Sequence, residues 1–157
     1  MKALILYYSY SGNTRNIAKL IQREIGGDIA EIKTVKPYEG NYNDVVNQGK
    51  YEIDSGFMPA IQPIDENIED YDTIILGSPV WWYTFAPAVH TFLKEYPLTG
   101  KTVYPFATNG GWIGHTFADF EKLCVGAAVK QGINIRFDEE VLRTPENEIK
   151  RWAKEIQ

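Results

Sequence analysis

The first apolar run of the chain and the polar loop behind it decide the fold. Residues 4–14 read Leu-Ile-Leu-Tyr-Tyr-Ser-Tyr-Ser-Gly-Asn-Thr. The apolar part is too short for a helix and is typical of a buried strand, whereas a helical pattern of apolar residues begins at Ile17. A strand, a tight polar loop and a helix N-terminus in this order form an anion site, because amides, hydroxyls and the helix dipole all favour negative charge. The sequence therefore predicts that a phosphate-bearing molecule binds at this loop.

Short apolar runs alternate with helical patterns along the rest of the chain. This alternation predicts a parallel sheet with helices on both faces and right-handed crossovers. Between Tyr38 and Pro63 the pattern is weak and predicts only a short helix over residues 43–51. The predicted strands are residues 3–8, 29–32, 73–76, 102–107 and 133–137, and the predicted helices are residues 14–25, a segment beginning at Pro87, residues 116–130, and a last helix with Thr144 as N-cap and Pro145 as first residue.

Length and composition limit the classes of function. A chain of 157 residues and 17.9 kDa predicts one domain over residues 1–157. Its net charge of -5 argues against a nucleic-acid partner, which usually requires a basic face. The single cysteine, Cys124, excludes an internal disulfide and a multi-thiolate metal site, and we expect it to be buried. No apolar run is long enough to span a membrane. Met1 and Lys2 followed by an apolar run are similar to the start of a signal peptide, but the run is too short and no small-residue cleavage site follows it. We therefore expect a cytoplasmic protein with no membrane contact, and we assign no metal ligands.

Three predicted strands end in loops of unusual composition. The first loop is the phosphate-like segment 9–15, the second is rich in aromatic residues at 77–85, and the third joins glycines to a tryptophan at 108–115. In a doubly wound sheet, ligands bind at the carboxyl ends of the strands, so we expect these loops to meet at one edge. Together they suit a ligand with a phosphate at one end and a flat ring system at the other.

The motifs of these loops are similar to those of one family. The pattern Ser9-x-Ser11-Gly12-Asn13-Thr14 resembles the FMN phosphate loop of flavodoxins. The runs over residues 74–82 and 100–111 resemble bacterial flavodoxin-like proteins that carry a Pro-x-Trp-Trp loop. This resemblance covers most of the chain and is weakest over residues 38–63. It implies a flavodoxin-like three-layer α/β sandwich whose five-stranded parallel sheet has the strand order 2-1-3-4-5.

The resemblance also implies FMN as the cofactor and a set of residues that bind it. The first loop would hold the phosphate, the second would hold the isoalloxazine with Trp81 as the expected stacking wall, and the third would face the polar edge of the ring. No residue of the chain is assigned a catalytic role, since the chemistry would belong to the flavin. The implied cofactor-binding residues are Ser9, Ser11, Gly12, Asn13, Thr14, Pro79, Val80, Trp81, Trp82, Tyr83, Thr108, Asn109, Gly110, Gly111, Trp112 and Gly114.

Two positions depart from the pattern of the family. Trp82 stands where many flavodoxins have a glycine, whose peptide turns over to hydrogen-bond the flavin after one-electron reduction. A side chain disfavours a positive φ, so we expect this turned-over state to be less accessible here. Trp112 stands where a small polar residue is common. Both departures weaken the expectation of strongly favoured one-electron chemistry.

Several of these residues also have a purely structural interpretation. Trp81, Trp82 and Trp112 could form core or a dimer interface, because paired aromatic side chains usually bury area. Arg15 could pair with the phosphate, although a solvated side chain is more typical of a first helical turn. His115 could tune or protonate a reduced flavin, since histidine titrates near neutral pH.

Two functions remain open at this point. The first is an electron carrier of the flavodoxin type that serves redox partner proteins. The second is an FMN-dependent NAD(P)H oxidoreductase that reduces a small-molecule acceptor such as a quinone or nitro compound. Either protein could be a monomer or a homodimer. A phosphatase of the Cys-x5-Arg type is disfavoured, because Ser9 stands in the place of the nucleophilic cysteine and lacks the low-pKa thiolate that this chemistry needs. A Walker-type NTPase is disfavoured because its Gly-Lys-[Ser/Thr] is missing.

Overall fold

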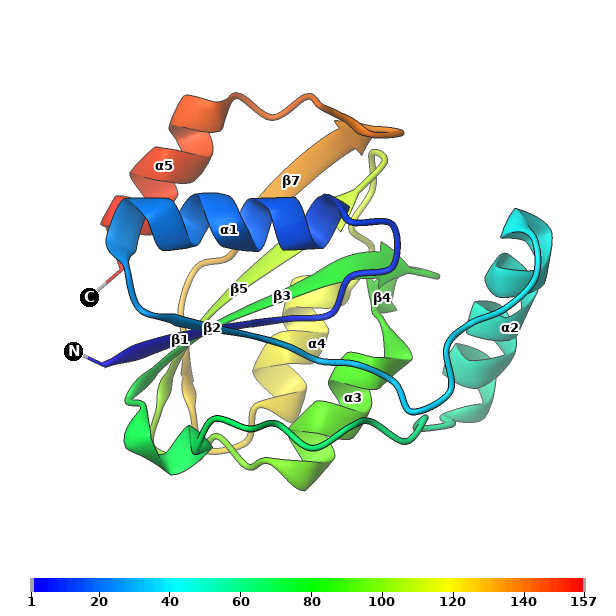
Figure 1. The fold of residues 1–157 in the computed structure, drawn as a ribbon, viewed down its shortest axis with the longest axis horizontal. Helices are drawn as coiled ribbons and strands as arrows, with labels where there is room; N and C mark the ends of the chain where they lie inside the picture. The colour runs from blue at the N-terminus through cyan, green and yellow to red at the C-terminus, as the bar shows by residue number, and fades with distance from the viewer. Residues whose placement is uncertain (1, 157) are drawn as a thin grey trace.

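The computed structural model describes residues 2–156 and is built on a twisted parallel sheet (Figure 1). The five long strands follow the order β2-β1-β3-β5-β7, which confirms the predicted order 2-1-3-4-5. All neighbouring pairs among them are parallel, with Leu6 beside Leu76 and Gly77 beside Phe106. The strands are β1 (Ala3–Tyr7), β2 (Asp28–Glu31), β3 (Thr73–Trp81), β5 (Thr102–Asn109) and β7 (Ile133–Asp138).

Helices cover both faces of this sheet, as the alternating pattern predicted. Figure 1 shows helices lying over each face of the sheet. Alternate residues of each strand point to opposite faces, so neighbouring residues enter different cores. Leu4 and Leu6 pack under one helix pair with Phe92 and Phe120, whereas Ile5 packs under the other pair. The first face carries α3 (Pro87–Glu95) and α4 (Thr116–Leu123), and the second carries α1 (Asn13–Ile25) and α5 (Glu146–Lys154).

Two predicted helix boundaries are wrong. The helix expected over residues 116–130 ends at Leu123, because Gly126 adopts a φ of 78° and the chain then forms a short strand beside β5. The last helix begins at Glu146 rather than at Pro145. Thr144 does not cap it, since the hydroxyl oxygen of Thr144 accepts the backbone N–H of Arg136 at 2.8 Å instead. The short elements are β4 (Thr84–Phe85), β6 (Ala128–Val129), β8 (Val141–Leu142) and a 3-10 turn at Ile68–Asp70.

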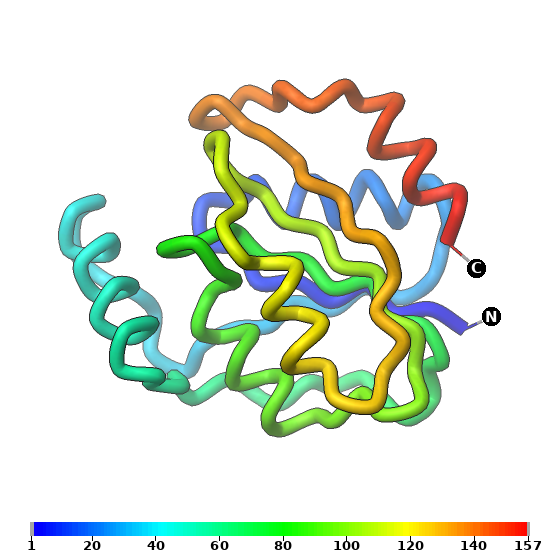
Figure 2. The backbone as a smooth tube through the Cα atoms, turned by 180° about the vertical axis from the view of Figure 1, so that it is seen from behind, coloured from blue at the N-terminus to red at the C-terminus, as the bar shows by residue number. Residues whose placement is uncertain are grey.

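Helix α2 (Tyr42–Ser55) stands apart from the two helical layers, on the side of the sheet where β1 and β3 end (Figure 2). It is longer than the helix predicted over residues 43–51. A reciprocal capping box starts it, in which the side chains of Asn41 and Asp44 each accept the other residue's backbone N–H. Only Val45, Gly49 and Glu52 of this helix are buried. The helix is therefore a lateral wall beside the strand ends rather than part of the core.

Within residues 2–156, no helix combines the length and the apolar character that a membrane crossing requires.

Candidate functional site

The loop between β1 and α1 is shaped as an open cradle. Gly12 adopts a φ of 102° and precedes the first residue of α1, and a side chain added to it would meet no atom within 4 Å. Across the described chain, no side chain caps this helix N-terminus, and its first turn carries no acidic residue. The hydroxyl oxygen of Ser9 accepts the backbone N–H groups of Gly12 and Arg15 at 3.1 and 3.2 Å. The hydroxyl hydrogen of Ser9 is left to donate elsewhere, and Ser11 is exposed at the rim.

A buried pair of hydroxyl groups joins this cradle to the loop that follows β5. The Oγ1 atoms of Thr14 and Thr108 lie 2.7 Å apart, and both side chains are buried. Only one of the two hydroxyl hydrogens can be shared between them. The second hydroxyl hydrogen remains available to a ligand at the strand ends. The first and third loops are thus in direct contact, as the sequence predicted.

Two other side chains of the first loop are engaged with the protein. The side-chain amide of Asn13 donates to the backbone oxygen of Glu139 at 2.9 Å, so its role in the structure is to hold the β7–β8 turn beside the cradle. The guanidinium of Arg15 bonds the carboxylate of Glu31 at 2.9 Å, and this bond raises the pKa of Arg15. The loop therefore offers backbone N–H groups and hydroxyls, rather than a free cation, to an anion.

The loop after β5 presents bare backbone to the same edge. Added side chains on Gly110 or Gly111 would meet no atom within 4 Å. The side chain of Asn109 folds the loop, since its oxygen accepts the N–H of Gly111 at 2.9 Å and its amide donates to Asn134. Gly114 differs from the other two glycines. A side chain there would collide with the backbone oxygen of Tyr83, so Gly114 is required by the close approach of the aromatic turn.

The aromatic loop is a tight hairpin in which two non-glycine residues have a positive φ. β3 runs to Trp81 and pairs in antiparallel fashion with Thr84 of β4. The two residues between them, Trp82 and Tyr83, adopt φ values of 49° and 73°. Trp82 thus adopts a positive φ although its side chain disfavours one. The lower accessibility of the turned-over state after one-electron reduction stays a prediction. The hairpin turn requires this backbone region at both central positions, and its flanking contacts compensate for the strain.

The loop after β5 and helix α4 hold this turn from one side. The backbone N–H of His115 donates to the oxygen of Tyr83 at 2.8 Å. One carboxylate oxygen of Asp119 accepts the hydroxyl of Thr84 and contacts Nδ1 of His115, each at 2.5 Å. The His115 side chain is 61% exposed and points into this contact, so the structure gives it a role in holding the turn.

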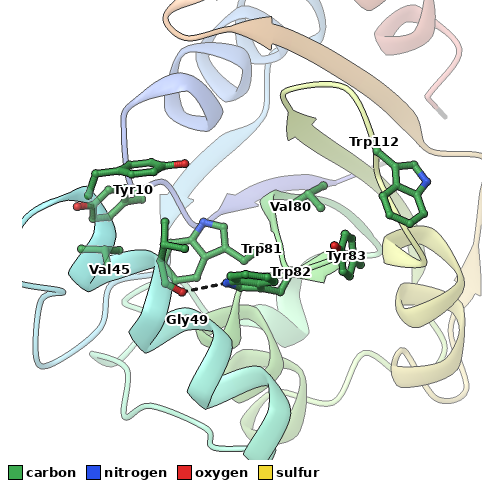
Figure 3. A pocket seen from close by; sticks show the side chains of 10 residues that line it. Tyr10, Val45, Gly49, Val80, Trp81, Trp82, Tyr83 and Trp112 are labelled. Carbon is green, nitrogen blue, oxygen red and sulfur yellow. Dashed lines mark hydrogen bonds between the residues drawn. The ribbon is translucent and has the colours of Figure 1, made fainter.

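Helix α2 holds the same turn from the other side. The indole N–H of Trp82 donates to the backbone oxygen of Val46 at 2.9 Å, drawn as a dashed line in Figure 3. The ammonium of Lys50 lies 5.5 Å from the centre of the Trp82 ring, within cation–π range. Trp82 is therefore packed against α2, in line with its structural interpretation, while one side of it still faces the pocket described next.

A pocket of about 480 Å³ opens between α2, the aromatic turn and the two neighbouring loops (Figure 3). Its volume is within the usual range for small-ligand sites. Trp81 lies in an aromatic cluster at its base, edge-on to Tyr8, Tyr10 and Tyr38 at ring separations of 5.0–5.9 Å. The lining residues are Tyr10, Tyr42, Val45, Val46, Gly49, Val80, Trp81, Trp82, Tyr83 and Trp112.

The structure divides the predicted site residues into three groups. Val80, Trp81, Trp82, Tyr83 and Trp112 line the pocket. A second group makes the cradle and the loop beside it, namely Ser9, Ser11, Gly12, Asn13, Thr14, Thr108, Asn109, Gly110 and Gly111. Pro79 and Gly114 belong to neither group, because Pro79 is not among the residues that line the pocket and Gly114 packs against Tyr83.

Sequence reasoning missed three parts of the site. The first is the α2 wall with Tyr42 and Val46, whose only signal is the capping box at Asn41. The second is Tyr10, which belongs to the cradle loop and also lines the pocket. The third is the contact of Asp119 with the aromatic turn, for which the sequence carries no signal.

Comparisons with known proteins bear directly on this site. The family model described as "Flavodoxin" matches residues 2–156. The chain belongs to the flavodoxin family. Flavodoxin 1 of Salmonella typhimurium is 30% identical over 106 residues, a match that covers 65% of this chain and 46% of that protein. The chain thus spans about half the length of this curated relative.

Two solved structures are similar to this chain over most of its length. A candidate flavoprotein from Bacteroides eggerthii is 32% identical, with a TM-score of 0.83 and coverage of 98% of this chain and 96% of that one. A flavoprotein from Lactobacillus acidophilus, solved in complex with FMN, is 31% identical, with a TM-score of 0.73 and coverage of 89% and 95%.

The residues present fit FMN at both of its ends. An uncapped helix N-terminus and a glycine with open space above it suit a phosphate, which binds backbone N–H groups at such positions. The aromatic pocket suits a planar ring, and Tyr10 belongs to the walls of both parts of the site. The bare backbone at Gly110 and Gly111 leaves room for a ring edge to approach.

Proposed function

We propose that this flavodoxin-family chain is an electron-transfer protein that works through bound FMN. FMN is its cofactor, as its family and the geometry of its site support. The observation that carries the proposal is the placement of Tyr10, which joins the open phosphate cradle to the pocket containing Trp81 and Trp112. A flavin with its phosphate in the cradle and its ring in the pocket would lie at the protein surface, where electrons can enter and leave. The flavin supplies the redox chemistry, and the protein supplies position and environment.

Different residues of the chain would bind the phosphate and the ring of this cofactor. The α1 N-terminus and the hydroxyls of Ser9 and Ser11 would bind the phosphate, with Gly12 allowing close backbone approach. The bare backbone of Gly110 and Gly111 would donate to the polar edge of the ring. The side chains of Trp81 and Trp112 would exclude water from its faces.

A carrier that receives its electrons from a partner protein is favoured over a direct NAD(P)H oxidoreductase. Among the pocket residues, all of which belong to the described chain, none carries a positive charge that could pair with the phosphates of a nicotinamide dinucleotide. Arg15, the basic residue of the cradle loop, is already bonded to Glu31. The second candidate function, reduction of quinones or nitro compounds by NAD(P)H, retains support from the aromatic character of the pocket.

Anaerobic mixing separates the two functions. The FMN-loaded protein is reduced with dithionite, freed of excess reductant, and mixed with oxidised cytochrome c as a generic acceptor. We expect the flavin absorption to return as the cytochrome is reduced, and we expect NADH or NADPH alone to leave the oxidised protein unchanged. Rapid loss of the flavin absorption on addition of NADPH, with steady reduction of an added quinone, would contradict the carrier function and support the oxidoreductase function. Failure of the reduced protein to pass electrons to any acceptor would overturn both.

A further inference from the structure

The pocket extends beyond the residues expected to touch a flavin. Four of its lining residues, Tyr42, Val45, Val46 and Gly49, come from α2, a helix outside the two layers that cover the sheet (Figure 3). On the opposite side, Tyr83 and Trp112 form a tilted pair with ring centres 4.8 Å apart. The pocket is therefore bounded by a helix wall on one side and by an aromatic pair on the other.

The chemistry of this lining is uniform. Every lining residue is aromatic, aliphatic or glycine, and across the described residues no carboxylate, ammonium or guanidinium lines the pocket. The indole N–H of Trp82 is already bonded to Val46, so the remaining side-chain donors of the lining are the tyrosine hydroxyls and the indole N–H groups of Trp81 and Trp112. A charged ligand would lose hydration here without gaining a partner, whereas an uncharged planar ligand gains stacking and apolar contact.

Four of the six exposed aromatic side chains of the described chain lie at this pocket, and the other two are Tyr51 and Phe57. Tyr10, Tyr42, Tyr83 and Trp112 are 46–78% exposed, and all four line the pocket. A group of exposed aromatic residues around a concave site marks a binding surface rather than ordinary surface composition.

The α2 wall is fixed in place although it buries few side chains. The Trp82–Val46 hydrogen bond and the contact of Lys50 with the Trp82 ring attach it to the aromatic turn. The buried carboxylate of Glu52 accepts the Tyr38 hydroxyl at 2.6 Å, which attaches the helix to the chain that precedes it. The wall is thus preformed, and a ligand need not order it.

We propose that the α2 side of this pocket is a subsite for an uncharged planar electron acceptor of the quinone class, bound beside the flavin ring. The proposal rests on the proposed function, since the acceptor receives its electrons from the reduced cofactor. Conversion of a quinone to its hydroquinone takes two electrons and two protons. The electrons come from the donor that reduces the cofactor, a reduced partner protein or, in the experiment, dithionite, and the protons come from solvent.

The test measures binding rather than turnover. Oxidised FMN-loaded protein is titrated with 2-methyl-1,4-naphthoquinone by calorimetry, and FMN affinity is measured separately on the apoprotein. The test variant is Tyr42→Ala, and the matched control is Tyr51→Ala, a tyrosine of the same helix that is 68% exposed and outside the lining. Tyr42→Phe keeps the ring and removes only the hydroxyl.

We expect Tyr42→Ala to weaken naphthoquinone binding roughly three- to tenfold, as loss of one aromatic contact implies. Tyr51→Ala and Tyr42→Phe should bind the quinone as the wild type does, and FMN affinity should be unchanged in all three. Equal quinone affinity in Tyr42→Ala and Tyr51→Ala would overturn the subsite. A parallel loss of FMN affinity in Tyr42→Ala would overturn it too, because the wall would then belong to the flavin ring. Failure of the wild type to bind FMN would instead overturn the proposed function, and that measurement is made without any quinone.

Discussion

The hydroxyl oxygens of Thr14 and Thr108 lie 2.7 Å apart in a buried contact that connects the first turn of α1 to the end of β5, 94 residues away in sequence. Thr14 is the second residue of α1, and Thr108 is the last buried residue of β5. The contact fixes the phosphate cradle relative to the glycine loop, the two parts of the site that present open backbone. Their separation is thus set before any ligand binds.

Removal of either hydroxyl should lower the stability of the folded protein. Thr14→Val or Thr108→Val leaves the other hydroxyl buried without its partner, and each should lower the free energy of unfolding by about 1–2 kcal/mol. The double variant should lose less than the sum, because no unpaired group remains. Urea unfolding of the four proteins measures the coupling. Strictly additive losses would show that the two hydroxyls do not depend on each other.

The aromatic turn allows a direct test of backbone strain. Tyr83 has a φ of 73°, and its side chain is 47% exposed. Tyr83→Gly and Tyr83→Ala both remove the ring, but only alanine keeps a Cβ in the left-handed region. The glycine variant should be more stable than the alanine variant by about 1 kcal/mol. Thermal unfolding of the pair decides the matter, and equal stability would mean that the turn is not held at this φ in solution.

The Asp119 carboxylate should be needed to hold the same turn. It accepts the Thr84 hydroxyl and contacts His115, so Asp119→Ala should cost about 1–2 kcal/mol. Thr84→Val should cost a similar amount, and the two losses should not add, because they remove one hydrogen bond. His115→Ala should cost less, since its ring is largely solvated. Chemical denaturation measures all three, and a fully additive Asp119–Thr84 double variant would contradict the contact.

The buried thiol predicts a pH dependence at alkaline pH. Burial raises the pKa of Cys124 from its usual value of 9.0 to about 11. The folded protein therefore keeps the thiol proton in a range where the unfolded chain has lost it, so this group lowers stability as pH rises from 9 to 11. The loss should be on the order of 2 kcal/mol across that range. Unfolding measurements at pH 8 and pH 10.5 should show a steeper loss for the wild type than for Cys124→Ala, whereas parallel curves would contradict the raised pKa.

The fold could be predicted from the sequence because each long strand carries its own signal. Ile74, Ile75 and Leu76 form an apolar run of the kind that only a two-sided parallel strand buries, and all three are fully buried. The cradle was also predictable, since the glycine, the hydroxyls and the helix pattern stand within a dozen residues. Local chemistry of this kind needs no knowledge of distant contacts.

The pocket could not be predicted in full, because its walls are joined by long-range contacts. The bond from Trp82 to the Val46 backbone spans 36 residues and uses a carbonyl group, which every residue has. Trp82 and Tyr83 have a positive φ, although two-residue hairpin turns usually use Asn-Gly at these positions. The residue types at the turn therefore gave no signal for this backbone conformation. The tertiary contacts of α2 and of Asp119 override the local preference here.

Calorimetric titration of the apoprotein with FMN and with riboflavin tests the central claim most directly. The two flavins share the ring and differ in the phosphate, so the difference in affinity isolates the cradle at Ser9–Thr14. The structure predicts that FMN binds at one site and that riboflavin binds far more weakly, with inorganic phosphate competing against FMN. Equal affinity for the two flavins, or no uptake of FMN at all, would contradict the account.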